Sequence, residues 1–136
     1  MAFNELLNHA DPVQLSPLNL AFVGDAVYTL LVRERLVSAA NRPAHSLNRA
    51  ASERVKAAAQ SSNYYKISEY LTEEEQAVLK RGRNANPSHT AKNAAIGDYR
   101  NATGLEALFG YLYISGQKAR VLELFEICWS EADEEK

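Results

Sequence analysis

Apolar residues recur at helical spacing through most of this 136-residue sequence, and no stretch alternates long enough with the period of two typical of a strand. Ser16-Pro17 provides a capping residue and a proline suited to a first helical turn, ahead of an amphipathic run over 18–37. Thr72 and Glu75 have the spacing of a capping box, and Gly116 follows a long apolar run as a C-terminal glycine. The sequence therefore predicts an all-α fold of six to seven helices.

The expected helices follow the apolar stripes between the turn residues: 18–37, 44–60, 61–71, 73–82, 98–115 and a last helix around 121–129. The stretch 84–93 contains a proline and almost nothing to bury, so we expect a loop there. The length predicts one domain spanning 1–136, whose acidic tail at 131–136 is expected to be partly disordered.

Composition excludes several classes of protein. A single cysteine, Cys128, forbids an internal disulfide and is typical of a reducing compartment. No apolar run reaches the roughly 18 to 20 residues that a membrane span needs, and residues 1–16 lack the basic start and apolar centre of a signal peptide. We therefore expect a cytoplasmic protein that does not associate with membranes.

The formal net charge of -2 conceals an asymmetry along the chain. Twelve of the 15 basic residues and seven acids lie between Arg33 and Arg100, a balance of +5, whereas the chain from Glu123 onward holds six acids and one lysine. An acidic tail can cancel a basic surface in the sum and leave the local field intact. The near-neutral total is thus compatible with a nucleic-acid partner, although an ordinary surface of mixed charge explains the same counts.

Asp25 occupies an unfavourable position in an otherwise apolar helical segment. Gly24-Asp25 falls in the middle of the predicted helix, where glycine costs about 1 kcal/mol relative to alanine and aspartate favours caps instead. A carboxylate at the edge of a core needs a partner or a metal ion. A neighbouring arginine or a backbone amide is the alternative partner.

Glu106 repeats this pattern in a second apolar helix. It is the single acid between residues 102 and 113, and it shares a helix face with Gly110. Gly24 and Gly110 would let the two helix backbones approach closely where the acids lie. Two carboxylates on crossing helices make a site for a hard divalent cation such as Mg²⁺, which prefers oxygen ligands and keeps several waters.

A basic cluster flanks the predicted loop. Arginines and amide side chains beside a flexible glycine suit contacts with phosphates. The candidates for RNA binding are therefore Arg81, Arg83, Asn84, Lys92, Asn93 and Arg100. We expect the remaining arginines at 42, 49 and 54 to lie on an ordinary solvated face.

These motifs resemble a known family. The segment 21–28 (AFVGDAVY) is similar to the first catalytic motif of ribonuclease III, and 105–113 (LEALFGYLY) is similar to the second. The segment 80–85 (KRGRNA) and Tyr99-Arg100 resemble the short bacterial form, Mini-ribonuclease III. The resemblance covers nearly the whole chain from residue 18 onward.

The resemblance implies an all-α ribonuclease III endonuclease-domain fold, a homodimer, and Mg²⁺-dependent hydrolysis of double-stranded RNA that leaves 5′-phosphate products. It also implies that the accessory double-stranded RNA-binding domain is absent, and that the substrate is the precursor of 23S ribosomal RNA, whose ends are trimmed. Asp25 and Glu106 match the family's catalytic, metal-binding acids. Tyr28 and Leu31 are candidates for the contact between subunits.

Two positions depart from the larger enzyme. Ala21 and Thr103 stand where its two motifs have a glutamate and an aspartate. Mini-ribonuclease III shares this reduced pattern, and the number of bound metal ions stays open. The alternative is a ribonuclease III-like RNA-binding module in ribosome assembly that has lost catalysis. A helical protein-interaction domain would leave the two acids and the basic loop unexplained.

Overall fold

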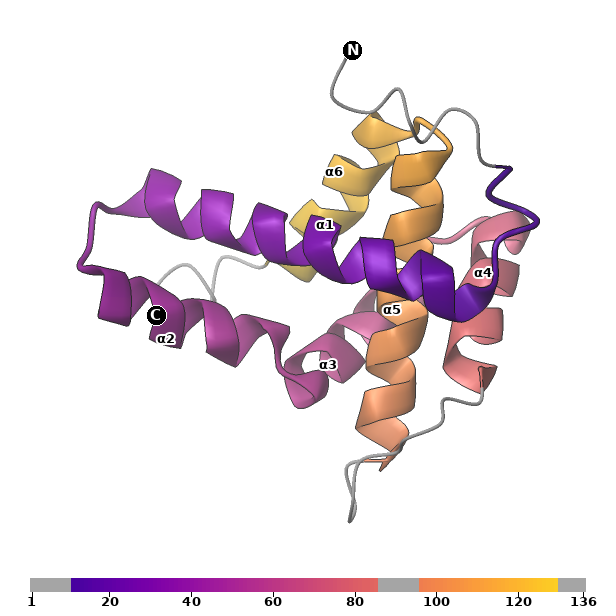
Figure 1. Cartoon of the computed structure of the whole chain (residues 1–136), viewed down its shortest axis with the longest axis horizontal. Coiled ribbons are helices and arrows are strands. Elements are labelled where there is room, and N and C mark those ends of the chain that lie inside the picture. The colour runs from indigo at the N-terminus through magenta and orange to yellow at the C-terminus, as the bar shows by residue number, and fades with distance from the viewer. Residues whose placement is uncertain (1–10, 86–95, 130–136) are drawn as a thin grey trace.

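The computed structural model describes residues 11–85 and 96–129, which form six helices (Figure 1). The part of the chain described contains no strand, so the all-α prediction is confirmed. The helices are α1 Pro17–Ala39, α2 Ala44–Val55, α3 Ala57–Ser68, α4 Glu73–Asn84, α5 Ile96–Ile114 and α6 Lys118–Cys128. None of them is long and apolar enough to cross a membrane.

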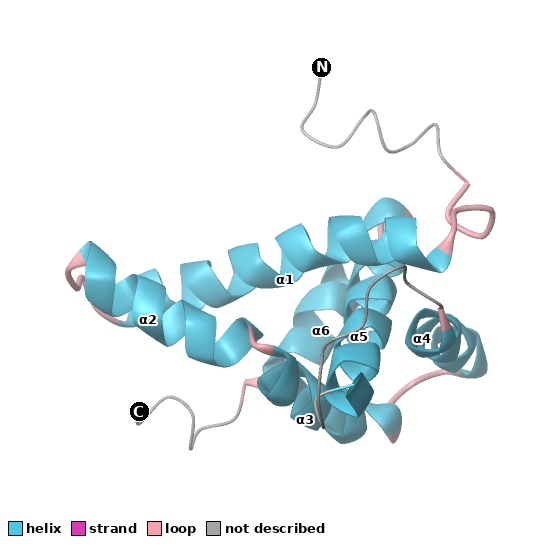
Figure 2. Cartoon of the chain, turned by 60° about the horizontal axis from the view of Figure 1, so that its bottom comes forward, coloured by secondary structure: helices cyan, strands magenta, loops and turns pink. Residues whose placement is uncertain are grey.

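Helix α5 lies at the centre of the fold, with α1 crossing it and α3, α4 and α6 packed around it (Figures 1 and 2). Most residues of its middle turns are buried, and four of them are fully inaccessible to solvent: Leu105, Leu108, Phe109 and Leu112. A helix that is apolar all round is stable only when other elements surround it. This central position explains why α5 is apolar around most of its circumference.

The ends of the helices follow the sequence signals. Ser16 accepts a hydrogen bond from the backbone N–H of Asn19 at the start of α1, and Thr72 and Glu75 form both halves of a capping box at the start of α4. Gly116 has a φ of 78° just after α5, a conformation that glycine adopts without strain. The caps predicted from the sequence are therefore confirmed.

The prediction of one helix over 44–60 is wrong. The chain leaves helical geometry at Lys56, where φ is -65° and ψ is 156°, and this break separates α2 from α3. The side-chain amide of Gln60 donates a hydrogen bond to the carbonyl oxygen of Val55 at 2.9 Å, which satisfies an acceptor at the end of α2. Neither glycine nor proline occurs at the break, so the alanine-rich sequence over 44–60 did not predict it.

Tyr28 belongs to the core, so the expectation that it lines a subunit contact is wrong. Its side chain is 2% exposed, and its ring packs edge-on against Phe109 and Phe125, with centroids 5.3 and 5.7 Å apart. Leu31 is half-buried against the same core.

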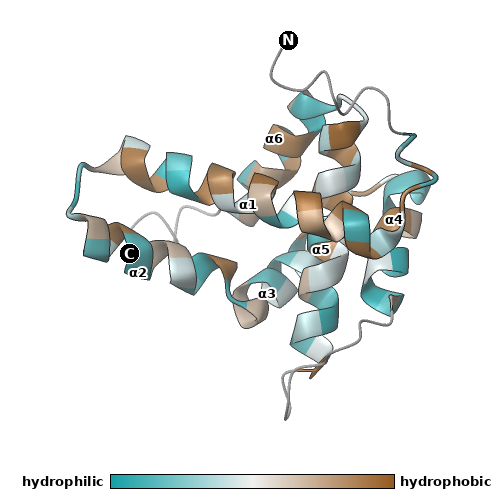
Figure 3. Ribbon diagram, in the orientation of Figure 1, coloured by the Kyte–Doolittle hydropathy of each residue, from teal (hydrophilic) through white to brown (hydrophobic). Residues whose placement is uncertain are grey.

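A different side of α1 faces solvent, and apolar residues occupy much of it (Figure 3). Phe22 is 83% exposed, and Ala26, Leu30 and Val37 share this side at helical spacing. We call these four residues the α1 apolar face. It begins at Phe22, two positions before Gly24, near the point where α1 crosses α5.

Candidate active site

Helices α1 and α5 touch backbone to backbone where they cross. A Cβ atom placed on Gly24 would lie 1.6 Å from the carbonyl oxygen of Glu106, and one on Gly110 would lie 1.9 Å from the carbonyl oxygen of Leu20. No side chain fits at either position. The close approach predicted from the two glycines is therefore confirmed.

This contact brings Asp25 and Glu106 together. Asp25 directly follows Gly24, and Glu106 lies one helical turn before Gly110, so the two carboxyl groups meet beside the crossing, close enough for the charge of Asp25 to act on Glu106. Asp25 is exposed to solvent, whereas Glu106 is only partly accessible. One acid of the pair therefore faces outward and the other faces the interior.

The pKa of Glu106 is raised to about 8. Burial is the main cause, followed by repulsion from the charge of Asp25 and the hydrogen bond between the two carboxyl groups, while a hydrogen bond from Gln60 acts in the opposite direction. Two ionised carboxylates this close repel each other unless a cation lies between them. A divalent cation would remove that repulsion and release the proton of Glu106.

Gln60 is a third member of the site that sequence reasoning missed. It comes from α3, is 1% exposed, and donates from Nε2 to Oε2 of Glu106 at 3.3 Å as well as to the end of α2. The one available signal was a long amide side chain in an alanine-rich helix. The hydrogen-bond partners of Gln60, Val55 and Glu106, are known only from the folded structure.

The oxygen donors fit a hard divalent cation. Among the described residues, no group of three or more histidine, cysteine, aspartate or glutamate side chains could hold a metal ion. Two carboxylates from different helices remain, a ligand set suited to Mg²⁺ because this ion completes its shell with water. Asp25 and Glu106 are the residues that would hold it.

Ala21 and Thr103 add no acidic oxygen to the site. Ala21 lies one turn before Asp25 on α1 and is 6% exposed, and Thr103 lies one turn before Glu106 on α5 and is 8% exposed. The hydroxyl group of Thr103 donates to the backbone carbonyl of Tyr99 at 3.0 Å. The two substitutions therefore leave a pair of carboxylates where the larger enzyme has four acids in these motifs.

The predicted RNA-binding residues separate into different environments. Arg81, on α4, and Arg100, on α5, are exposed. Arg83 is half-buried, and its Nη1 donates to Oδ1 of Asn84 at 3.3 Å. Lys92 and Asn93 lie outside the described residues.

Arg83 also connects three helices. Its Nε donates to Oδ1 of Asn101 at 2.9 Å, and Nδ2 of Asn101 donates to the hydroxyl of Ser61 at 2.9 Å. Asn101 and Ser61 are buried, so this chain of hydrogen bonds joins α4, α5 and α3 inside the protein. Arg83 thus has a structural role in addition to any contact with RNA.

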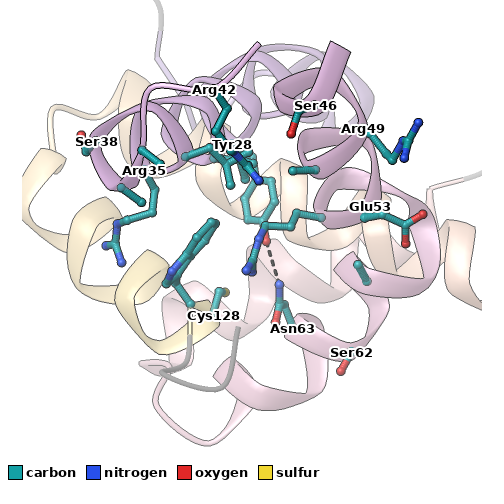
Figure 4. Close-up of a pocket in the computed structure, with 18 of the residues that line it drawn as sticks. Tyr28, Arg35, Ser38, Arg42, Ser46, Arg49, Glu53, Ser62, Asn63 and Cys128 are labelled. Carbon is teal, nitrogen blue, oxygen red and sulfur yellow. Dashed lines mark hydrogen bonds between the residues drawn. The ribbon is translucent and has the colours of Figure 1, made fainter. Parts of the chain in front are cut away.

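Of the arginines expected on a solvated face, Arg49 is exposed, whereas Arg42 and Arg54 are half-buried, and all three line one groove. Arg42, Arg49 and Arg54 surround a groove of about 1170 Å³ between α1, α2, α3 and the end of α6 (Figure 4). The guanidinium group of Arg54 lies 3.5 Å from the ring centroid of Trp129, a cation–π contact that attaches α2 to the end of α6. Asp25 and Glu106 do not line this groove.

Comparison with known proteins identifies the family. Residues 18–117 match the model of the Ribonuclease III domain. A Mini-ribonuclease 3 from Thermoanaerobacter sp. (strain X514) is 42% identical over 123 residues, which cover 90% of this chain and 87% of the relative. The Mini-ribonuclease 3 of Brevibacillus brevis is 46% identical over 116 residues, 85% of this chain and 87% of that protein. This chain belongs to the Mini-ribonuclease 3 branch of the ribonuclease III family.

Membership of the Mini-ribonuclease 3 branch confirms the predicted fold family and the prediction of an endoribonuclease. A crystal structure of a protein from Fusobacterium nucleatum superimposes with a TM-score of 0.79 at 28% sequence identity, over 87% of this chain and 95% of that one. The site described above therefore lies in a fold that a related protein also adopts.

Proposed function

We propose that this chain hydrolyses double-stranded RNA with a divalent cation, Mg²⁺, held by Asp25 and Glu106. The observation that supports this most directly is the meeting of the two carboxyl groups beside a helix crossing that only glycine permits. The raised pKa of Glu106, caused by burial and by the charge of Asp25, supports a cation beside the pair. An arrangement of this kind is typical of functional sites rather than of structural ion pairs.

The reaction is hydrolysis of a phosphodiester bond. When bound, Mg²⁺ supplies a Lewis acid that polarises the scissile phosphate and lowers the pKa of water. The Asp25 carboxylate is exposed and therefore accessible to RNA, and Gln60 donates a hydrogen bond to the carboxylate of Glu106. Attack by water on phosphorus, with departure of the 3′ oxygen, leaves a 5′-phosphate and a 3′-hydroxyl.

We assign the RNA surface to the end of α4 and the start of α5. Arg81 and Arg100 are exposed there, beside Arg83 and Asn84, and Lys92 and Asn93 belong to the segment between these helices. A-form RNA is recognised mainly by shape, phosphates and 2′-hydroxyls, so charge and reach matter more here than base-reading groups.

A homodimer would place one such site on each strand of a duplex. The α1 apolar face supports this proposal, because Phe22 and its neighbours are exposed within a few residues of Asp25. Exposed apolar patches of this kind mark interaction sites. A two-fold contact through this face would hold the two pairs of acids near each other.

The substrate we propose is the 23S ribosomal RNA precursor in the cytoplasm, whose ends would be trimmed. Similarity to Mini-ribonuclease 3 proteins over most of the chain supports it. The competing function is RNA binding in ribosome assembly without cleavage, which the absence of acids at Ala21 and Thr103 favours.

Cleavage of double-stranded RNA by the purified protein with Mg²⁺ tests the proposal. Asp25→Asn and Glu106→Gln should each abolish cleavage but leave RNA binding within a few-fold of wild type. Glu34→Gln, an exposed acid of α1 outside the site, is the control and should cut normally. Binding without cleavage by the wild-type protein would establish the RNA-binding module instead.

A further inference from the structure

We propose that Gln60 is a positioning residue of the metal site, with its amide nitrogen holding Glu106 and its amide oxygen accepting a hydrogen bond from water that the divalent cation retains. The inference rests on the proposed function, because it assigns a role in the same site. The Gln60 side chain is buried and neutral, so it contributes no charge to the site.

The orientation of the Gln60 amide follows from its partners. The carbonyl oxygen of Val55, 2.9 Å away, can only accept a hydrogen bond, so the amide nitrogen must face it. The second hydrogen of the same nitrogen is directed at Oε2 of Glu106, 3.3 Å away. Both donors are thereby used, and the end of α2 prevents the amide from turning over.

The amide oxygen is left buried without a hydrogen-bond partner among the described residues. An unpaired buried acceptor costs about 1 to 3 kcal/mol, so a donor is expected at this position. Asp25 and Glu106 are both acceptors once they are ionised. The donor that the site lacks is therefore a water molecule, and Mg²⁺ keeps several waters when it binds to two carboxylates.

The neighbouring positions explain why this role falls to α3. Ala21 offers a methyl group, and the hydroxyl of Thr103 is engaged with a backbone carbonyl. Ala21 therefore has no group that could hold a water, and Thr103, which has already used its one donor hydrogen, offers only the lone pairs of its hydroxyl oxygen. Gln60 reaches the acids from the third helix and, through Val55, depends on the break between α2 and α3 for its orientation.

The affinity of the RNA-free protein for Mn²⁺ tests this role without any cleavage. It is measured from the electron paramagnetic resonance signal of the unbound ion. Gln60→Met keeps the chain length and removes both amide groups, and we expect it to weaken Mn²⁺ binding by about tenfold to a hundredfold. Gln76→Met is a matched control, because Nε2 of Gln76 donates to the carbonyl of Ser68 at the end of α3, 3.1 Å away, far from the acids in sequence and contact. It should bind Mn²⁺ like the wild type.

A second variant distinguishes a role of Gln60 in the metal site from a role in stabilising the break between α2 and α3. Gln60→Glu loses the amide donor to Glu106 but keeps acceptor oxygens and adds a negative charge that attracts the cation. We therefore expect Mn²⁺ binding at least as tight as in the wild type, together with a lower melting temperature of the metal-free protein. A purely structural role predicts weaker Mn²⁺ binding in both Gln60 variants, and that result would overturn the inference, as would wild-type affinity in Gln60→Met. If Gln60→Met does not fold, the Gln60→Glu affinity alone decides.

The proposed function fails in a different way. If Asp25→Asn binds Mn²⁺ as tightly as the wild type, the metal site itself is misassigned. If Asp25→Asn abolishes binding while Gln60→Met leaves it unchanged, the site stands and the role of Gln60 is refuted.

Discussion

Replacing Gly24 with alanine tests the helix crossing on which the two acids depend. The added Cβ would lie 1.6 Å from the carbonyl oxygen of Glu106, whereas real Cβ atoms essentially never come within 3.0 Å of a non-bonded atom of another helix, so α1 and α5 must separate by about 1.4 Å at this contact. The three atoms nearest to the new methyl group all belong to the backbone of α5, so no rotamer change can relieve the clash with them. The carboxyl groups of Asp25 and Glu106 would move apart with the helices.

The cost should be large because the crossing lies in the core. Overpacking of side chains costs about 1 to 3 kcal/mol, and a clash between two backbones belongs at or above the top of that range. A domain of this size has a total free energy of unfolding of about 5 to 15 kcal/mol. Gly24→Ala should therefore lose a large part of its stability, or fail to fold.

Urea unfolding followed by circular dichroism measures this loss. The control is Gly97→Ala on α5, where an added Cβ meets nothing within 4 Å. Alanine there should be neutral or stabilising by up to about 1 kcal/mol. A Gly24→Ala protein with the same midpoint as Gly97→Ala would refute the backbone contact and, with it, the geometry of the acid pair.

Three further perturbations test other parts of the molecule. The hydrogen bond from Arg120 holds the pKa of Glu75 below its usual value of 4.5, so this pair stabilises the fold above pH 4.5 and the contribution is lost as pH falls through the lowered pKa. Glu75→Gln should therefore lower stability at neutral pH and flatten its decline in acid, as read from urea midpoints across pH; curves parallel to wild type would contradict this. Phe22→Asp should give a monomer in sedimentation velocity. The control is Leu122→Asp, at another exposed apolar residue on α6, and it should remain a dimer. A dimer of the Phe22→Asp protein would argue against a subunit contact through the α1 apolar face. Arg81→Ala should weaken RNA binding and reduce the slope of log affinity against log salt by about 1, with Lys118→Ala as control; an unchanged slope removes the phosphate contact.

Local features could be predicted from the sequence because their causes are local. The cap at Ser16, the capping box at Thr72 and the turn at Gly116 each depend on residues within a few positions of one another. The break at Lys56 could not be predicted in this way, since the side chain that satisfies the end of α2 comes from the next helix. Tyr28 was misplaced for a related reason: helical spacing identifies an apolar face but does not say what covers it.

The sequence by itself determined the class of fold and the pair of acids worth attention, because glycine and a carboxylate in the middle of an apolar helix are unfavourable unless something compensates. Tertiary structure alone decided how that compensation works. The crossing of α1 and α5 brings Asp25 and Glu106 into contact and raises the pKa of Glu106, and it places a buried amide from α3 beside them. Hydrogen bonds and desolvation depend on distances between residues 35 to 81 positions apart in the chain, and only packing sets those distances.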